Sequence, residues 1–287
     1  MRMDVVLYLH GKGGVAAEAA RYRPLFPACD VVGFDYKAET PWEAAPELQA
    51  EIAALQKRYD GVYLIANSIG AFYAMHAGID RSISHAWFIS PVVDMEALIT
   101  GMMAQAGVSE EELERRGVIA TDGGTLSWEY LQFVRTHPIV WNEPTDLLYG
   151  SEDALTSRAA IEAFAAAHGA RLCVMEGGEH WFHTDEQLHY LDGWIASTAA
   201  DADQLRRIAK FETLMREAQA LLAAGDCGKA LQEKLAALEA YYTSDDWKRD
   251  FADDEAGKFP NDLPRGVLSE DGIYNLLEGY RERMCDR

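Results

Sequence analysis

The chain has 287 residues, 49% of them hydrophobic and 25% charged, a composition typical of a globular protein with one large domain and a small one. Its 47 acidic residues outnumber the 26 basic ones, and the net charge of -21 disfavours binding to nucleic acid or to anionic membrane surfaces. The four cysteines are far apart, and we find neither a signal peptide nor a membrane span, so we expect free thiols and a cytoplasmic location.

Short apolar runs alternate with helix-patterned segments through the first two thirds of the chain. Six runs predict β-strands, at residues 5–9, 31–35, 62–66, 86–89, 145–149 and 171–175. Helices are expected between them, over 46–59, from 69 to 75 and over 161–167. Apolar strands that alternate with helices predict an α/β fold with a mostly parallel sheet of about six strands, covered by helices on both faces. Such sheets place their sites at the carboxyl ends of the strands.

Two segments depart from this alternation. Residues from about 95 to 138 contain a charged helical turn and the Gly123-Gly124 break, and we expect them to form a short lid insertion. From about residue 201, apolar residues such as Leu205 and Ile208 recur only at helical spacing. We therefore expect two domains: residues 1–200 with the lid insertion at about 95–138, and a small all-α domain at 201–287.

A serine between small residues follows the third strand, in the run Ala66-Asn67-Ser68-Ile69-Gly70. A strand, a sharp turn and a helix that meet at a serine form a nucleophile elbow, which needs small residues two positions before and after the serine. The strained turn makes the hydroxyl project above the sheet. Ser68 could instead cap the helix that follows, because serine is a common N-cap residue. The elbow alone does not decide between these two roles.

A glycine-rich loop, His10-Gly11-Lys12-Gly13-Gly14, follows the first strand. Glycines let a backbone approach a reacting carbon closely, and backbone N–H groups there can stabilise the oxyanion of an acyl-transfer reaction. We expect the amides of Lys12 and Ile69 to be these donors. A phosphate-binding loop is the alternative, but the run lacks the spacing of the known glycine-rich phosphate motifs.

The fifth strand ends in a loop that carries two carboxylates, in the run Tyr149-Gly150-Ser151-Glu152-Asp153. A carboxylate at this edge of the sheet can orient the imidazole of a catalytic histidine and stabilise its cation. On the residues alone, Glu152 and Asp153 are both candidates.

The sixth strand leads into Gly177-Gly178-Glu179-His180, which places a histidine at the same edge. His183 is a second candidate, but residues 184–187 read Thr-Asp-Glu-Gln, a capping box that opens the next helix and makes His183 a residue flanking the cap. His180 lies nearer the strand end, so we favour it as the base that takes the serine proton.

With these residues together, the region from about 4 to 198 resembles the α/β-hydrolase superfamily. HGKGG at 10–14, ANSIG at 66–70, YGSED at 149–153 and GGEH at 177–180 carry the resemblance, in the order serine, acid, histidine that this fold uses. The resemblance implies a compact version of the α/β-hydrolase fold without its first two strands, a Ser68–His180–Asp153 triad and hydrolysis through an acyl-enzyme. Asp153 is preferred to Glu152 because the family pattern places the acid there.

The tail from about 205 to 285 is similar to a small bacterial domain of unknown function. This likeness is carried by Phe211-Glu212, Tyr241-Tyr242-Thr243-Ser244, Trp247-Lys248-Arg249-Asp250 and the run GVLSEDG at 266–272. It implies a helical fold and no particular activity. We expect the tail to pack near the hydrolase domain or to mediate homo-oligomer formation.

The predicted function is a cytoplasmic serine hydrolase that cleaves a carboxylic ester, thioester or amide of a small-molecule acyl substrate, with no cofactor, metal, nucleic acid or membrane partner. A small-substrate esterase is the leading hypothesis, because no extended lid or repeat suggests a polymer substrate. An acyltransferase or a peptidase would use the same triad, and a non-catalytic binding protein could keep the fold. The substrate pocket is expected at His10, Gly11, Met102, Met103, Trp128 and Phe133.

Overall fold

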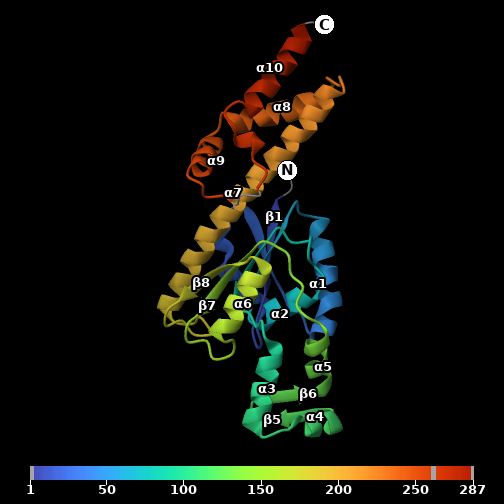
Figure 1. Ribbon diagram of the computed structural model, residues 1–287, viewed down its shortest axis with the longest axis vertical. Helices are drawn as coiled ribbons and strands as arrows, with labels where there is room; N and C mark the ends of the chain where they lie inside the picture. Colours follow the sequence, from blue (N-terminus) through green and yellow to red (C-terminus); the bar gives the residue numbers. More distant parts are fainter. Residues whose placement is uncertain (1–2, 260–262, 286–287) are drawn as a thin grey trace. The chain divides into compact units, whose positions relative to one another are not determined.

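The computed structural model describes residues 3–259 and 263–285, and the chain divides into two compact units, 1–198 and 199–287. The first unit is a sheet with helices packed on both faces, and the second consists of helices (Figure 1). Helix α7 (Asp185–Ala223) continues without interruption from the first unit into the second. The change of hydrophobic pattern near residue 200 therefore falls inside a helix and not at a loop.

Six strands form the main sheet in the order β2-β1-β3-β4-β7-β8, and every pairing is parallel. They are β1 (Asp4–Leu9), β2 (Cys29–Phe34), β3 (Val62–Asn67), β4 (His85–Ile89), β7 (Thr145–Gly150) and β8 (Arg171–Met175). The prediction of a mostly parallel sheet of about six strands is confirmed. After β1 the chain first adds β2 on one side and then β3 on the other, so the strand order reverses between β1 and β3. The carboxyl ends of these two strands form the crevice in which such sheets bind ligands.

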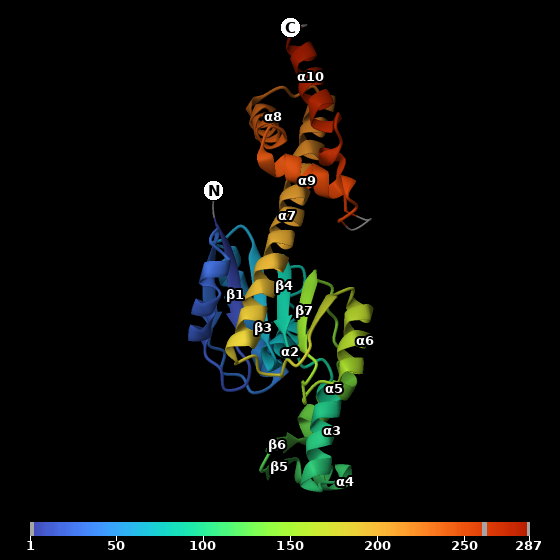
Figure 2. The same ribbon diagram turned by 90° about the vertical axis from the view of Figure 1, so that its left-hand side faces the viewer.

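Helices cover the two faces of the sheet unequally. Helices α1 (Pro41–Gln56), α2 (Ile69–His76) and α6 (Arg158–His168) pack on a core that includes Leu7, Leu48 and Phe72. The first part of α7 lies on the opposite face (Figure 2). There Trp87 of β4 donates a hydrogen bond from Nε1 to Thr198 Oγ1 at 2.9 Å. Helix α1 begins at Pro41, five residues before the predicted start. The reason is local, because Thr40 caps it and proline is favoured at the first helical position.

A buried carboxylate, Asp146, lies at the amino end of β7, beside the first residues of β4 and β8. Asp146 is about 1% exposed and accepts hydrogen bonds from His85 and Arg171, at 2.7 Å each from His85 Nε2 and Arg171 Nε. This edge is opposite the carboxyl ends of the strands, so we treat the cluster as a structural feature of the sheet.

The segment between β4 and β7 forms an insertion with its own secondary structure (Figure 1). It contains α3 (Met95–Ala106), α4 (Glu110–Arg116), an antiparallel pair of β5 (Val118–Thr121) and β6 (Gly124–Ser127), and α5 (Trp128–Thr136). The antiparallel pair was not predicted, because each of its strands has only four residues. Leu113, Leu126 and Leu131 are fully buried between these elements. The insertion therefore packs its own apolar side chains.

The second unit is all helical in its described residues, as predicted. It contains the later part of α7, α8 (Lys229–Tyr242), α9 (Asp245–Glu255) and α10 (Gly272–Cys285), around a core that includes Ile208, Leu238 and Ile273. Asp250 is completely buried in this unit and accepts hydrogen bonds from Arg207 and Tyr241. Within 3–259 and 263–285, none of the helices combines the length and the apolar character needed to cross a bilayer.

Candidate active site

Ser68 occupies a sharp turn between β3 and α2. Its backbone has φ 52° and ψ -118°, a region that costs energy for any residue with a side chain. The Ser68 N–H donates to the Ile89 carbonyl of β4 at 2.9 Å, and the Ser68 carbonyl accepts from the Ala71 N–H of α2 at 3.2 Å, so the neighbouring strand and the following helix hold the strained turn. The side chain makes no capping hydrogen bond to α2. The turn thus has the geometry of a nucleophile elbow, and Ser68 does not act as a side-chain cap.

The glycine-rich loop after β1 lies directly against this turn. A Cβ atom at position 70 would be 2.5 Å from the His10 carbonyl oxygen, and one at position 11 would be 3.3 Å from the Ser68 Cβ. Real Cβ atoms do not approach a carbonyl oxygen as closely as 2.5 Å, so Gly70 is required for this contact. Small residues at these positions therefore bring the loop up to the serine.

The structure brings three of the predicted catalytic residues together in one hydrogen-bonded chain. Ser68 Oγ lies 2.8 Å from His180 Nε2, and His180 Nδ1 lies 2.7 Å from Asp153 Oδ2. The Asp153 side chain is completely buried and that of His180 is 18% exposed. The other carboxylate oxygen, Oδ1, accepts from the backbone N–H groups of Leu155 and Thr156 at 2.7 and 3.0 Å. Both oxygens of Asp153 therefore have hydrogen-bond partners that hold the carboxylate in place.

The two competing candidates point elsewhere. The side chain of Glu152 is exposed, and its backbone N–H donates to the Gly178 carbonyl at 2.8 Å. This hydrogen bond connects the loop after β7 with the loop after β8. His183 Nδ1 donates to the carbonyl of Trp181 at 2.8 Å and lies 3.3 Å from a Glu179 carboxylate oxygen. Neither side chain takes part in the hydrogen-bonded chain that starts at Ser68.

The predicted oxyanion donors flank Ser68 from two elements. Lys12 lies in the loop after β1, and Ile69 is the first residue of α2, where backbone N–H groups have no partner within the helix. In the two described stretches of the chain, we find no protein acceptor for either N–H. Both groups are therefore available to a ligand oxygen.

A cavity of about 650 Å³ opens beside Ser68 and His180. Its polar wall includes Lys12, Glu18 and Arg21, and Tyr8 donates to Glu18 at 2.6 Å. Burial and the hydrogen bond to Glu18 raise the pKa of the Tyr8 hydroxyl, so it remains a donor to Glu18 at alkaline pH as well. The apolar wall consists of aromatic and aliphatic side chains, namely Tyr22, Ile89, Leu155, Trp181, Phe182, Leu188 and Leu191.

Of the six predicted pocket residues, only Gly11 lines this cavity. The His10 ring stacks on the Tyr36 ring, with ring centres 4.4 Å apart. The remaining four lie in the insertion, and their placement corrects the prediction: Met102, Met103, Trp128 and Phe133. Their side chains pack within the insertion and against neighbouring helices, because a segment with several helices buries its apolar groups internally.

Most residues that do line the cavity were missed by sequence reasoning. Tyr22 belongs to the turns after β1, and Leu188 and Leu191 belong to the first turns of α7, so no local pattern connects them. Trp181 is the exception. Because it directly follows His180 in the sequence, Trp181 could have been predicted to line the cavity.

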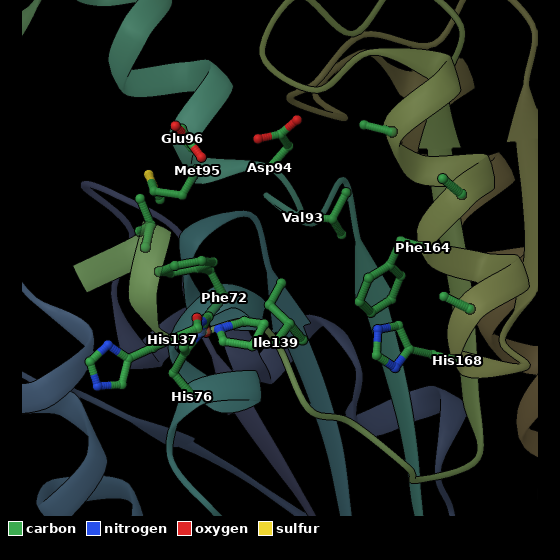
Figure 3. Close-up of a pocket in the computed structure, with 15 residues that line it drawn as sticks. Phe72, His76, Val93, Asp94, Met95, Glu96, His137, Ile139, Phe164 and His168 are labelled. Atoms are coloured by element: carbon green, nitrogen blue, oxygen red, sulfur yellow. The ribbon is translucent and has the colours of Figure 1, made fainter. Parts of the chain in front are cut away.

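A second cavity, of about 390 Å³, lies between α2, α3, α5 and α6 (Figure 3). Three histidines line it, and a ring nitrogen of each forms a hydrogen bond with a backbone carbonyl. His76 Nδ1 binds the Phe72 carbonyl, and His168 Nδ1 binds the Trp141 carbonyl. His137 Nδ1 likewise binds the Phe133 carbonyl. In the described part of the chain no group of three His, Cys, Asp or Glu side chains could hold a metal ion. This cavity contains none of the predicted catalytic residues.

Comparison with known proteins finds similar proteins for both parts of the chain. Residues 206–286 match the model of a domain of unknown function, DUF4298, whereas comparison with curated proteins gives no match. Est1E from Butyrivibrio proteoclasticus has a similar structure, with a TM-score of 0.57, 15% identity, and coverage of 70% of this chain and 88% of that one.

Two further structures are similar over the same part. The mouse alpha/beta hydrolase domain-containing protein 10 has a TM-score of 0.54 at 16% identity, over 69% of this chain and 90% of that one. A soluble variant of monoglyceride lipase from Saccharomyces cerevisiae has a TM-score of 0.51 at 12% identity, over 70% of this chain and 88% of that one. The chain thus has the α/β-hydrolase fold, followed by a helical region that matches DUF4298.

Proposed function

We propose that this protein is a serine hydrolase that cleaves a carboxylic ester, thioester or amide of a small substrate through an acyl-enzyme on Ser68, with an ester as the leading candidate. One observation carries the proposal: the contacts of 2.8 and 2.7 Å that connect Ser68, His180 and the buried Asp153. A serine hydroxyl becomes a useful nucleophile only when a base beside it can take its proton.

The first half of the reaction follows from this geometry. His180 Nε2 takes the Ser68 proton while Oγ attacks the substrate carbonyl carbon, and Asp153 stabilises the imidazolium that forms. The negative charge that develops on the carbonyl oxygen is stabilised by the N–H groups of Lys12 and Ile69. His180 then gives the proton to the leaving atom as its bond to the carbonyl carbon breaks.

The second half repeats these steps with water. His180 takes a proton from a water molecule, the resulting hydroxide attacks the acyl carbon, and the proton returns to Ser68 Oγ as the acid product leaves. The cavity of about 650 Å³ is within the usual range for small-molecule sites, which supports a small substrate.

Labelling with a fluorophosphonate probe tests the proposal directly. We expect one adduct, located at Ser68 by peptide mass spectrometry, and steady hydrolysis of p-nitrophenyl acetate. The variant Ser68→Ala should lose both while its thermal unfolding stays that of the parent. A folded parent protein without an adduct would support a non-catalytic binding protein, and turnover by the variant would place the nucleophile elsewhere. Acyl transfer to an added alcohol or amine in preference to water would instead indicate an acyltransferase.

A further inference from the structure

Trp181 is the most exposed large apolar side chain at the cavity beside Ser68. It directly follows His180, lines the same cavity and is 70% exposed. Exposed tryptophan is uncommon away from binding sites, because its indole ring carries a large apolar surface. We infer that Trp181 forms a subsite for the leaving group of the substrate and selects esters of aryl or arylalkyl alcohols; this inference rests on the proposed hydrolase function.

The Trp181 ring is supported on one face. It stacks on the His183 imidazole, with ring centres 4.7 Å apart and an angle of 21° between planes. A ring that is covered on one face and still 70% exposed presents its other face to solvent. That uncovered face is available for an offset stack with a second aromatic ring.

His183 is itself held in place. Its Nδ1 donates to the Trp181 carbonyl at 2.8 Å and lies 3.3 Å from a Glu179 carboxylate oxygen, and its backbone N–H donates to Gln187 at 3.1 Å. These contacts fix the ring beneath the indole. A preorganised platform loses little conformational entropy when a ligand stacks on it.

The chemistry of the reaction assigns this platform to the leaving group. The substrate carbonyl oxygen is directed toward Lys12 and Ile69, whereas the leaving oxygen must come within hydrogen-bond distance of His180 to receive its proton. The group attached to the leaving oxygen therefore extends past His180 along the cavity wall. Trp181 lies there, and Leu155 on the loop that carries the acid is 45% exposed at the same cavity. Both side chains are apolar, so the group that they favour is apolar as well.

The experiment keeps the acyl group constant and varies the alcohol. Benzyl acetate and methyl acetate form the same acetyl-enzyme, so the ratio of their kcat/KM values reports only the contacts of the leaving group during acylation. Acetate release measures both. We expect Trp181→Ala to lower the benzyl-to-methyl ratio about tenfold, near the upper limit for a stacked aromatic pair. Trp181→Phe should keep most of the preference.

Two controls separate this role from a structural one. Tyr274→Ala removes a similarly exposed ring from the second unit and should leave the ratio unchanged. The ratio between benzyl butyrate and benzyl acetate, which varies the acyl group, should not respond to Trp181→Ala. A benzyl-to-methyl ratio that changes less than twofold, or an acyl ratio that changes as much, would overturn the inference. Absence of acetate release from both esters together with absence of a Ser68 adduct would instead refute the proposed function.

Discussion

The variant Asp153→Asn tests the proposed role of the carboxylate without changing its shape. Oδ1 accepts two backbone N–H groups, from Leu155 and Thr156, while Oδ2 faces His180 Nδ1 at 2.7 Å. The two backbone donors require an acceptor, so the oxygen of the new amide must take the place of Oδ1. Its NH₂ group then faces His180 Nδ1.

This orientation forces His180 into the wrong tautomer. An NH₂ donor opposite Nδ1 requires an unprotonated nitrogen there, which leaves the ring proton on Nε2. Nε2 can then only donate to Ser68 Oγ and cannot take its proton. We expect kcat to fall about 10⁴-fold, or about 5 kcal/mol of transition-state stabilisation. The free energy of unfolding should fall by only about 1 kcal/mol, because the two backbone hydrogen bonds to the side chain remain.

Stopped-flow release of p-nitrophenol from p-nitrophenyl acetate measures the acylation rate, and urea unfolding measures stability. Glu152→Gln is the matched control, since it removes the charge from the exposed neighbouring carboxylate and should change kcat less than twofold. An Asp153→Asn variant within tenfold of the parent would refute the tautomer argument. A large loss in Glu152→Gln would identify Glu152 as the acid.

Two further predictions concern packing and pH. Gly70→Ala would place a Cβ atom 2.5 Å from a carbonyl oxygen of the glycine-rich loop, so we expect kcat/KM to fall at least about 100-fold and stability to fall by about 1–3 kcal/mol. Gly101→Ala, which meets no atom within 4 Å, should be neutral or stabilising in thermal unfolding, and equal effects of the two would contradict this account. Burial raises the pKa of the Asp146 carboxyl, but hydrogen bonds from His85 and Arg171 outweigh it, so the folded-state pKa lies below 3.8. Its contribution to stability is present above pH 3.8 and is lost as the pH falls through the folded-state pKa. Asp146→Asn should therefore flatten the acid limb of a urea-unfolding pH series, and parallel curves would refute this.

Local patterns predicted the sheet because its strands are short apolar runs followed by glycine-containing turns, as in β1 and β3. They predicted helix ends less well. The start of α1 depends on one hydrogen bond, which the Glu43 N–H donates to Thr40 Oγ1, and α7 passes through residue 200 although its hydrophobic pattern changes there. A change of hydrophobic pattern indicates that a helix packs against different side chains from that point on. The backbone hydrogen bonds of the helix are not affected by this change.

The cavity was beyond sequence reasoning for a different reason. Large apolar residues of the insertion, such as Trp128 and Phe133, were expected to line it, but apolar side chains are equally suited to a core. Which of the two they join depends on contacts between distant segments. Tyr22 and Leu188 come together only because the turns after β1 and the start of α7 meet beside Ser68.

The geometry at Ser68 was predictable because the close contacts between its loops require glycine. Gly70 lets the serine turn meet the loop after β1, where a Cβ atom would be 2.5 Å from the His10 carbonyl oxygen. Gly150 has the same role on the other side, since a Cβ atom there would collide with the Gly178 carbonyl between the acid and histidine loops. Each of the four motifs contains a glycine, so each marks a place where two backbones can touch. A pocket wall is made of side chains from distant segments, and no glycine pattern indicates where they meet. The hydrogen-bonded chain could therefore be predicted from the sequence, whereas the residues of the cavity beside it could not.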